Sequence, residues 1–249
     1  MKDMLFSNRF VQKILNINTE IIKKNPLTGE DVKRFREGKK PRKWNNTSQS
    51  ERYCIDIFQK MMEILDTIED LKAVQIFLRQ YPYPKTLRKN KITRSVYFGY
   101  HIEIYFIKLA SLRDKMALLL NEVFNLGLPD KEAKIDLISK MKQTKEKSTI
   151  KFLKDFSDSI NGVTRLKNII VHKGRYDDKH LLELRMYEML DDNKKVIPSG
   201  FLKIMASLYI NKKRKIFKKN QKKIDRFLDK FFLGLNKEFD REYKKLIKK

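Results

Sequence analysis

Arg165, Asn168 and His172 are three polar residues of different types within one short stretch of the sequence, Val163 to Gly174. Histidine is scarce here, with only three in the chain, and its side chain can gain or lose a proton near neutral pH. On a helix, Arg165 and His172 are only about 20° out of register and lie roughly 10 Å apart along the axis. The three side chains therefore share one helical face that suits a groove, and two copies of the chain could bring two such faces together.

The surrounding sequence predicts a short helix that positions this face. Asn161-Gly162 is expected to interrupt the chain, and Thr164 can cap a helix that runs for about two and a half turns from Arg165 to Lys173. Gly174 then ends it. An alternative reading is structural, with a helix-terminal histidine favoured by the helix dipole and Arg165 as a surface cation.

The whole chain is expected to be all-α. It has 249 residues, 41% of them hydrophobic, with only eight Gly and six Pro, which is enough apolar surface for a core but too few turn residues for a β protein. Helical spacing of apolar residues predicts a multi-helix bundle around a long central helix at 93–126. The other expected helices cover 5–22, 50–81 (one helix, or two broken near Asp66), 130–141, 148–160, 180–190 and 201–249.

We expect one domain over residues 1–249, in which N-terminal helices (1–90) with a basic loop (27–50) precede a core (91–191) and a basic C-terminal helical segment (198–249). Glu103 lies on the central helix among apolar neighbours three and four residues away. A buried carboxylate requires a partner. Arg165 or a lysine would make it part of a site, whereas a glutamate at the boundary of the core would simply reach solvent.

The formal charge of +26, from 57 basic and 31 acidic residues, favours a polyanionic partner, although a lysine-rich composition is the simpler explanation. The surplus is clustered, because residues 203–249 hold 17 Lys/Arg and five Asp/Glu. Lys212, Lys213 and Arg214 are the nucleic-acid-binding candidates there. In the loop the candidates are Lys39, Lys40, Arg42 and Lys43, beside Trp44, which either stacks on a base or anchors the loop to the core.

The sequence lacks the motifs of several other kinds of catalytic and binding site. The sequence has no zinc-ligand spacing and no phosphate-binding glycine loop or nucleophile elbow, so neither a metal nor another cofactor is expected. The single Cys54 excludes an intramolecular disulfide and fits a reducing compartment. Charged residues interrupt the most apolar run, Val96 to Leu112, and no secretory signal is evident. We expect a cytoplasmic protein without a membrane partner.

The run R-L-K-N-I-I-V-H (165–172) resembles the Arg-x(4–6)-His motif of the HEPN superfamily, all-α nucleotide- and RNA-binding domains that include metal-independent ribonucleases of bacterial defence and toxin systems. Arg165 and His172 have the six-residue spacing. The family's four-residue form would align with Lys167-Asn168, but a lysine lacks the planar bidentate contact of a guanidinium. Leu166 also departs from the polar residue that often follows the arginine. Arg165 is therefore the first choice for the basic position and Lys167 the second.

The resemblance implies a homodimer that cleaves RNA without a metal, with two copies of the motif in one cleft. His172 would transfer the 2′-hydroxyl proton, and Arg165 would stabilise charge on the phosphate. Asn168 would orient His172 or bind the phosphate, with Glu103 as a further member. Lys167, Lys173 and Arg175 would contact the nucleic acid. The alternatives are a non-catalytic module that binds nucleic acid or a partner protein, and a toxin held inactive by a cognate antitoxin or regulatory protein.

Overall fold

The computed structural model describes residues 7–24, 26, 29–30, 33, 37, 47–82, 84–144, 147–194, 197–198 and 200–248. Within these ranges the regular secondary structure is helical and no strand occurs. The all-α prediction is therefore confirmed. No helix among the described residues is long and apolar enough to cross a membrane.

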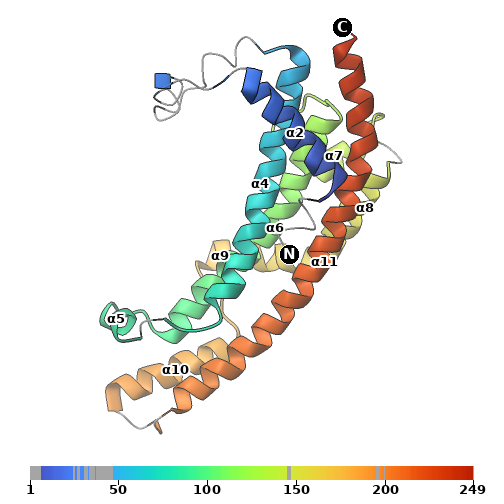
Figure 1. Cartoon of the computed structure of the whole chain (residues 1–249). Coiled ribbons are helices and arrows are strands. Elements are labelled where there is room, and N and C mark those ends of the chain that lie inside the picture. The colour runs from blue at the N-terminus through green and yellow to red at the C-terminus, as the bar shows by residue number, and fades with distance from the viewer. Residues whose placement is uncertain are drawn as a thin grey trace. The chain divides into compact units, whose positions relative to one another are not determined.

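The helices follow one another along the chain as Figure 1 shows. Their bounds are α2 Arg9–Lys24, α4 Gln49–Phe77, α5 Pro84–Lys89, α6 Arg94–Val123, α7 Ile135–Ile138, α8 Ser148–Ser159, α9 Asn161–Lys173, α10 Lys179–Lys194 and α11 Phe201–Ile247. The predicted long helix at 93–126 corresponds to α6. The predicted C-terminal helical segment is the single helix α11, of 47 residues.

Helix α5 was not predicted; Pro84 opens it in a first turn that needs no proline N–H. Two local predictions were wrong. The helix expected at 130–141 contracts to α7, since the Asn121 side chain bonds both the N–H and the C=O of Leu128 (3.1 and 3.0 Å) and holds the preceding loop. Thr164 does not cap α9, which begins at Asn161.

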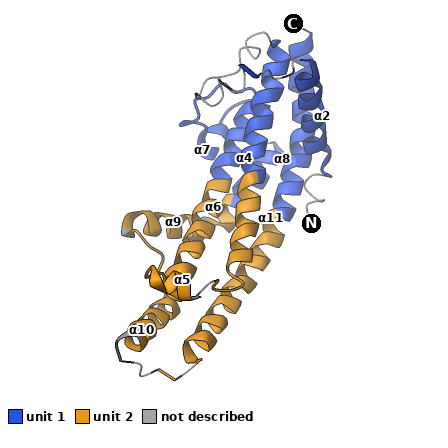
Figure 2. Ribbon diagram, turned by 60° about the vertical axis from the view of Figure 1, so that its left-hand side comes forward, with its two compact units in different colours: residues 1–65, 113–156, 225–249 blue, residues 66–112, 157–224 orange. Residues whose placement is uncertain are grey.

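The chain forms two compact units (Figure 2). Unit 1 contains residues 1–65, 113–156 and 225–249, and unit 2 contains residues 66–112 and 157–224. Aromatic rings build the core of unit 1. Phe10 contacts Phe232 and Phe239 with ring centroids 5.9 and 6.0 Å apart, and Tyr53 stacks on Phe239 at 5.7 Å. These contacts join α2 and α4 to the C-terminal part of α11.

Unit 2 contains α9, α10, the first part of α6 and the basic part of α11, and it too has an aromatic core. The Tyr105 ring of α6 stacks on Phe217 of α11, with centroids 3.7 Å apart. Phe106 contacts Tyr176, in the turn after α9, at 5.4 Å. The turn that follows the Arg-x6-His segment is thus packed against α6 within the same unit.

Gly234 of α11 should resist replacement by alanine. In most helices this change stabilises by about 0.5–1 kcal/mol. Here an added Cβ would lie 2.5 Å from Cγ2 of the buried Thr149, so we expect Gly234→Ala to destabilise unit 1 by about 1–3 kcal/mol. Urea unfolding measures the change. Thr149→Ser removes the clashing methyl group, so Gly234→Ala should cost much less in that background; an equal cost in both would contradict the close approach.

Candidate active site

Helix α9 presents the three predicted residues on an exposed face. Arg165, Asn168 and His172 are all exposed, whereas Ile170 is buried and Val163 is half-buried on the opposite face. Within the described part of the chain, none of the three polar side chains forms a hydrogen bond or ion pair. They are therefore open to a ligand or to another protein surface.

Lys167 lies on the other side of α9. It is half-buried, and five residues of helix place it about 140° around the axis from His172. Arg165 is only about 20° from His172. Of the two candidates for the basic position, Arg165 is the one that shares the exposed face with the histidine.

The C-terminal end of α9 is fixed by backbone geometry and by a contact to α6. Gly174 ends the helix with φ 73°, and its N–H bonds to the carbonyl of Ile170, as in a left-handed helix cap. Two residues later, the backbone N–H of Tyr176 donates to Oε1 of Glu103 at 2.5 Å. Glu103 therefore finds its partner in the turn after α9, and the exposed Arg165 does not fill that role.

A hydrogen-bonded network centred on Asp178 connects the same turn to α11. We call it the Asp178 network, and it consists of Tyr176, Asp178, Tyr209 and Lys213. Nζ of Lys213 lies 2.6 Å from Oδ2 of Asp178 and donates to the hydroxyl of Tyr176 at 2.8 Å. The Tyr176 and Tyr209 hydroxyls also donate to Oδ2, at 2.9 and 3.1 Å. The other carboxylate oxygen accepts the N–H of Leu181 at 2.9 Å, which caps α10.

The environment of the Asp178 network stabilises one charge state. Burial alone would raise the pKa of Asp178, but hydrogen bonds from Lys213, Leu181 and Tyr176 outweigh it and lower that pKa to about 2. Burial, together with the negative Asp178, raises the pKa of the Tyr176 and Tyr209 hydroxyls. An ionised Asp178 between protonated partners is thus the stable form near neutral pH.

Two predicted nucleic-acid contacts are engaged within the protein. Lys213 points into the Asp178 network and has a side chain only 14% exposed. Arg175 is exposed, and its Nε lies 2.5 Å from Oδ2 of Asp177, which also pairs with Arg185 at 3.1 Å. Lys212 is exposed and Arg214 half-buried. Lys39, Lys40, Arg42 and Lys43, with Trp44, lie outside the described residues, as does the side chain of Lys173.

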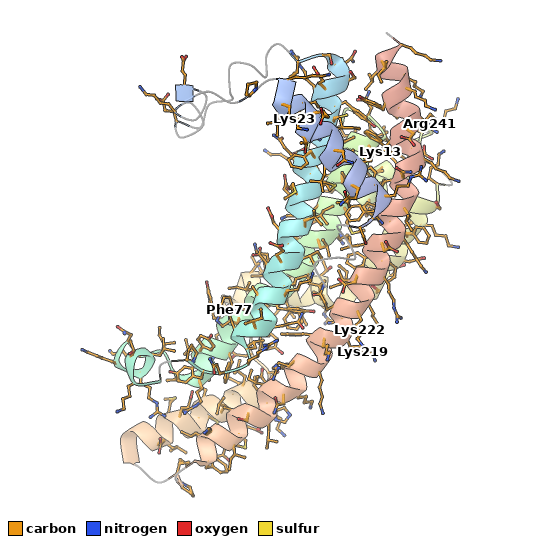
Figure 3. The ribbon with its side chains drawn as sticks, in the orientation of Figure 1. Lys13, Lys23, Phe77, Lys219, Lys222 and Arg241 are labelled. Atoms are coloured by element: carbon orange, nitrogen blue, oxygen red, sulfur yellow. The ribbon has the colours of Figure 1, made fainter. Side chains whose placement is uncertain are left out.

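The residues 201–224 of α11 form a more extensive basic face than the sequence candidates suggested. This stretch contains nine Lys/Arg and no Asp/Glu. Five exposed lysines had not been singled out individually, namely Lys215, Lys218, Lys219, Lys222 and Lys223. Figure 3 shows Lys219 and Lys222 on the middle part of α11. Their three- and four-residue spacing was the signal in the sequence, since it places lysines along one side of a helix.

The other two histidines, His101 and His180, contact neighbouring side chains of the fold. His101 packs against Phe77 and Tyr97, with ring centroids 5.2 and 4.5 Å apart, and burial lowers its pKa. His180 is exposed and its Nδ1 lies 3.2 Å from Glu183. In the part of the chain that the structure covers, no group of three or more His, Cys, Asp or Glu residues is arranged to hold a metal ion.

Comparison with known families identifies the class of the protein. The family model of Cthe2314-like HEPN domains (HEPN_Cthe2314) matches residues 41–236. The chain therefore belongs to the HEPN superfamily, as the Arg165–His172 spacing had suggested. The match extends beyond the predicted core at 91–191 and takes in α4 and most of α11. Searches of curated proteins and of solved structures gave no match.

Because of the Asp178 network, the free energy of unfolding should depend on pH between about pH 4 and pH 2. The folded-state pKa of about 2 lies below the ordinary 3.8, so ionised Asp178 contributes its full stabilisation above about pH 4 and loses it as the pH falls to 2. The shift corresponds to about 2 kcal/mol before solvent screening, which reduces it to about 1 kcal/mol for this partly exposed carboxylate. We expect Asp178→Asn to lower the free energy of unfolding by about 1 kcal/mol at pH 6.

Chemical unfolding at a series of pH values measures this effect. The difference between the parent protein and Asp178→Asn should shrink steadily between about pH 4 and pH 2. Asp177→Asn serves as the control because it leaves Asp178 intact. The free energy of unfolding of this variant should still fall between about pH 4 and pH 2, as it does in the parent protein. A difference that does not change over this range would show that Asp178 is not held ionised by its partners.

Proposed function

We propose that this protein is a metal-independent endoribonuclease whose catalytic groups lie on the exposed face of α9. The observation that carries the proposal is the placement of Arg165, Asn168 and His172 together on one exposed helical face, in a chain of the HEPN superfamily. A predicted role in a bacterial defence or toxin system, with an antitoxin or regulatory partner, rests on the family resemblance alone.

The proposed reaction is an attack within the RNA chain. A neutral His172 takes the proton of a 2′-hydroxyl, and the 2′ oxygen forms a bond to the adjacent phosphorus while the bond from phosphorus to the 5′ oxygen breaks. An imidazolium returns a proton to that leaving oxygen, so that the products are a 2′,3′-cyclic phosphate and a 5′-hydroxyl. Arg165 stabilises the charge that develops on the phosphate oxygens, and Asn168 orients the phosphate or His172.

This reaction supports a dimeric site. The reaction uses one histidine as base and another group as acid. Within one copy of α9, Arg165 and His172 lie about 10 Å apart along the helix axis, so one helix does not bring all these groups to one phosphate. Ile169 and Val171, beside His172, are exposed by 39% and 61%. Apolar side chains next to a polar site gain stability when another surface covers them. A second copy of α9 would supply both the cover and the second histidine.

His172→Ala should lower the rate of RNA cleavage by about 10²–10⁴-fold, because it removes the group that transfers the proton. The measurement is the single-turnover cleavage rate of a mixed-sequence RNA in a chelator such as EDTA. His180→Ala is the matched control, since it removes the other exposed histidine and should leave the rate unchanged. Arg165→Lys should also slow cleavage while keeping the charge, because the bidentate contact is lost.

Several outcomes would contradict the proposal. Equal cleavage by the parent protein and His172→Ala would remove the proposed role of the histidine, and cleavage abolished by EDTA would remove the metal-independent mechanism. Circular dichroism and sedimentation of each variant establish that folding and oligomeric state are unchanged. The cyclic phosphate and 5′-hydroxyl ends of the products test the attack by the 2′-hydroxyl.

The basic face of α11 supports a second function, binding of nucleic acid without cleavage. Residues 201–224 contain no carboxylate, and eight of their nine cations remain besides the inward Lys213 that pairs with Asp178. They create a local positive potential that attracts a phosphate backbone. Such binding requires neither His172 nor a dimeric site. Salt-dependent binding by a protein that leaves the RNA intact would favour this function over the nuclease.

Replacing Lys219 and Lys222 by glutamine should reduce the salt dependence of RNA binding. Each phosphate contact contributes about 0.7 to the slope of log Kobs against log salt for single strands, so the double variant should lose up to about 1.4 of slope. Fluorescence anisotropy over a salt series measures it. The control replaces Lys23 and Lys24, two exposed lysines of α2, and the same loss in both double variants would show that only net charge matters.

A further inference from the structure

A cavity lined by cationic residues lies in unit 2, and none of its lining residues belongs to α9. Its volume is about 350 Å³. Its walls come from two stretches that are distant in the sequence: residues 88–94, from α5 to the start of α6, and residues 191–203, from the end of α10 to the first turn of α11. The lining residues are Arg88, Arg94, Asp191, Ile197, Pro198, Gly200, Leu202 and Lys203.

The charges around this cavity are unbalanced. Arg88, Arg94 and Lys203 contribute three positive charges to the wall, and Asp191 contributes one negative charge. Within the described residues, none of the three cations forms an ion pair with a carboxylate. Like charges gathered around one cavity repel each other, so the arrangement is stabilised when an anion enters.

Arg94 has a hydrogen-bond donor that the described residues leave unsatisfied. Its Nη1 atom is shielded from solvent and has no hydrogen-bond acceptor among the described residues. The guanidinium carbon lies 5.3 Å from the centre of the Tyr81 ring, a cation–π contact that favours this position of the side chain. A shielded guanidinium N–H without an acceptor costs free energy. Arg94 as a whole is half-buried and lines the cavity, so an oxyanion there would accept from the accessible part of the side chain.

One carboxylate close to the backbone of Arg94 is already engaged. Glu188 accepts the backbone N–H groups of Arg94 and Ser95 at 2.8 and 3.1 Å, so it caps the N-terminus of α6 and leaves the guanidinium group of Arg94 without a partner. The cavity is also bordered by the N-terminal turn of α11, where Gly200 adopts φ 84°. First-turn N–H groups and the helix dipole favour an anion at that end.

We propose that this cavity binds a phosphate group, with Arg94 and Lys203 as its principal ligands and Arg88 at the entrance. Guanidinium groups bind phosphate oxygens through short, charge-assisted hydrogen bonds. The volume is at the lower end of the range for small-ligand sites, about 300–1,000 Å³, so it accommodates a phosphate with an attached sugar. The phosphate of a mononucleotide and the 5′-terminal phosphate of an RNA strand share this chemistry.

The experiment measures binding to the full-length protein by isothermal titration calorimetry. The probes are inorganic phosphate, adenosine 5′-monophosphate, and one short oligoribonucleotide prepared with a 5′-phosphate and with a 5′-hydroxyl. Affinity for the monophosphate identifies a mononucleotide site. A preference for the 5′-phosphorylated oligonucleotide over its 5′-hydroxyl form, without affinity for the monophosphate, identifies an RNA end. The oligonucleotide arms use His172→Ala, so that cleavage does not interfere.

Variants that each remove one charge separate local contact from net charge. We expect Arg94→Gln to weaken phosphate binding by about tenfold or more and Lys203→Gln by about three- to tenfold. Lys89→Gln changes the exposed lysine beside Arg88 on α5 and should stay within about twofold. Asp191→Asn removes the carboxylate from the wall and should strengthen binding, a result that damage to the fold would not produce.

Absence of phosphate-dependent binding by any probe would overturn the proposal. So would equal weakening by Arg94→Gln, Lys203→Gln and Lys89→Gln, because binding would then depend on net charge alone. Melting curves establish that each variant is folded, and Asp191→Asn keeps the test decisive if Arg94→Gln is unstable. None of these measurements depends on RNA cleavage, so this inference and the proposed nuclease succeed or fail separately.

Discussion

The position of α9 depends on how the turn that follows it is held. That turn is bonded to α6 through Glu103 and the N–H of Tyr176, and to α11 through Asp178 and Lys213. Both bonds use a partly buried carboxylate with a matched donor. Removing either donor would leave a partly shielded carboxylate without its partner, which costs free energy. The exposed face with His172 is therefore carried by a helix whose C-terminal end is fixed to two others.

The lysines of α11 illustrate how one helix serves two purposes. Lys213 faces inward and completes the Asp178 network, whereas Lys219 and Lys222 face solvent a few turns later. The inward lysine lies in contact with two tyrosine rings as well as a carboxylate. Inside unit 2, the same basic stretch thus stabilises the fold and leaves an open positive surface.

The polar face of α9 is incomplete as a catalytic centre in one copy of the chain. Its arginine and histidine lie two turns apart, and none of its three polar side chains has a partner among the described residues. An enzyme usually fixes its catalytic groups with supporting hydrogen bonds. The support in this protein would come from a second copy or from the substrate itself, which is why the proposed nuclease is a dimer.

The sequence by itself determined the helical class, the long helix α6, and the shared face of Arg165 and His172, because these follow from periodicities that each segment carries within itself. It did not determine the partner of Glu103, the inward direction of Lys213 or the charge cluster around Arg94. Each of those depends on residues far apart in the chain, since a side chain's partner is fixed only when helices pack. The bounds of α5 and of the short α7 also could not be predicted from periodicity. They depend on Pro84, which opens α5, and on the Asn121 side chain, which bonds the loop before α7.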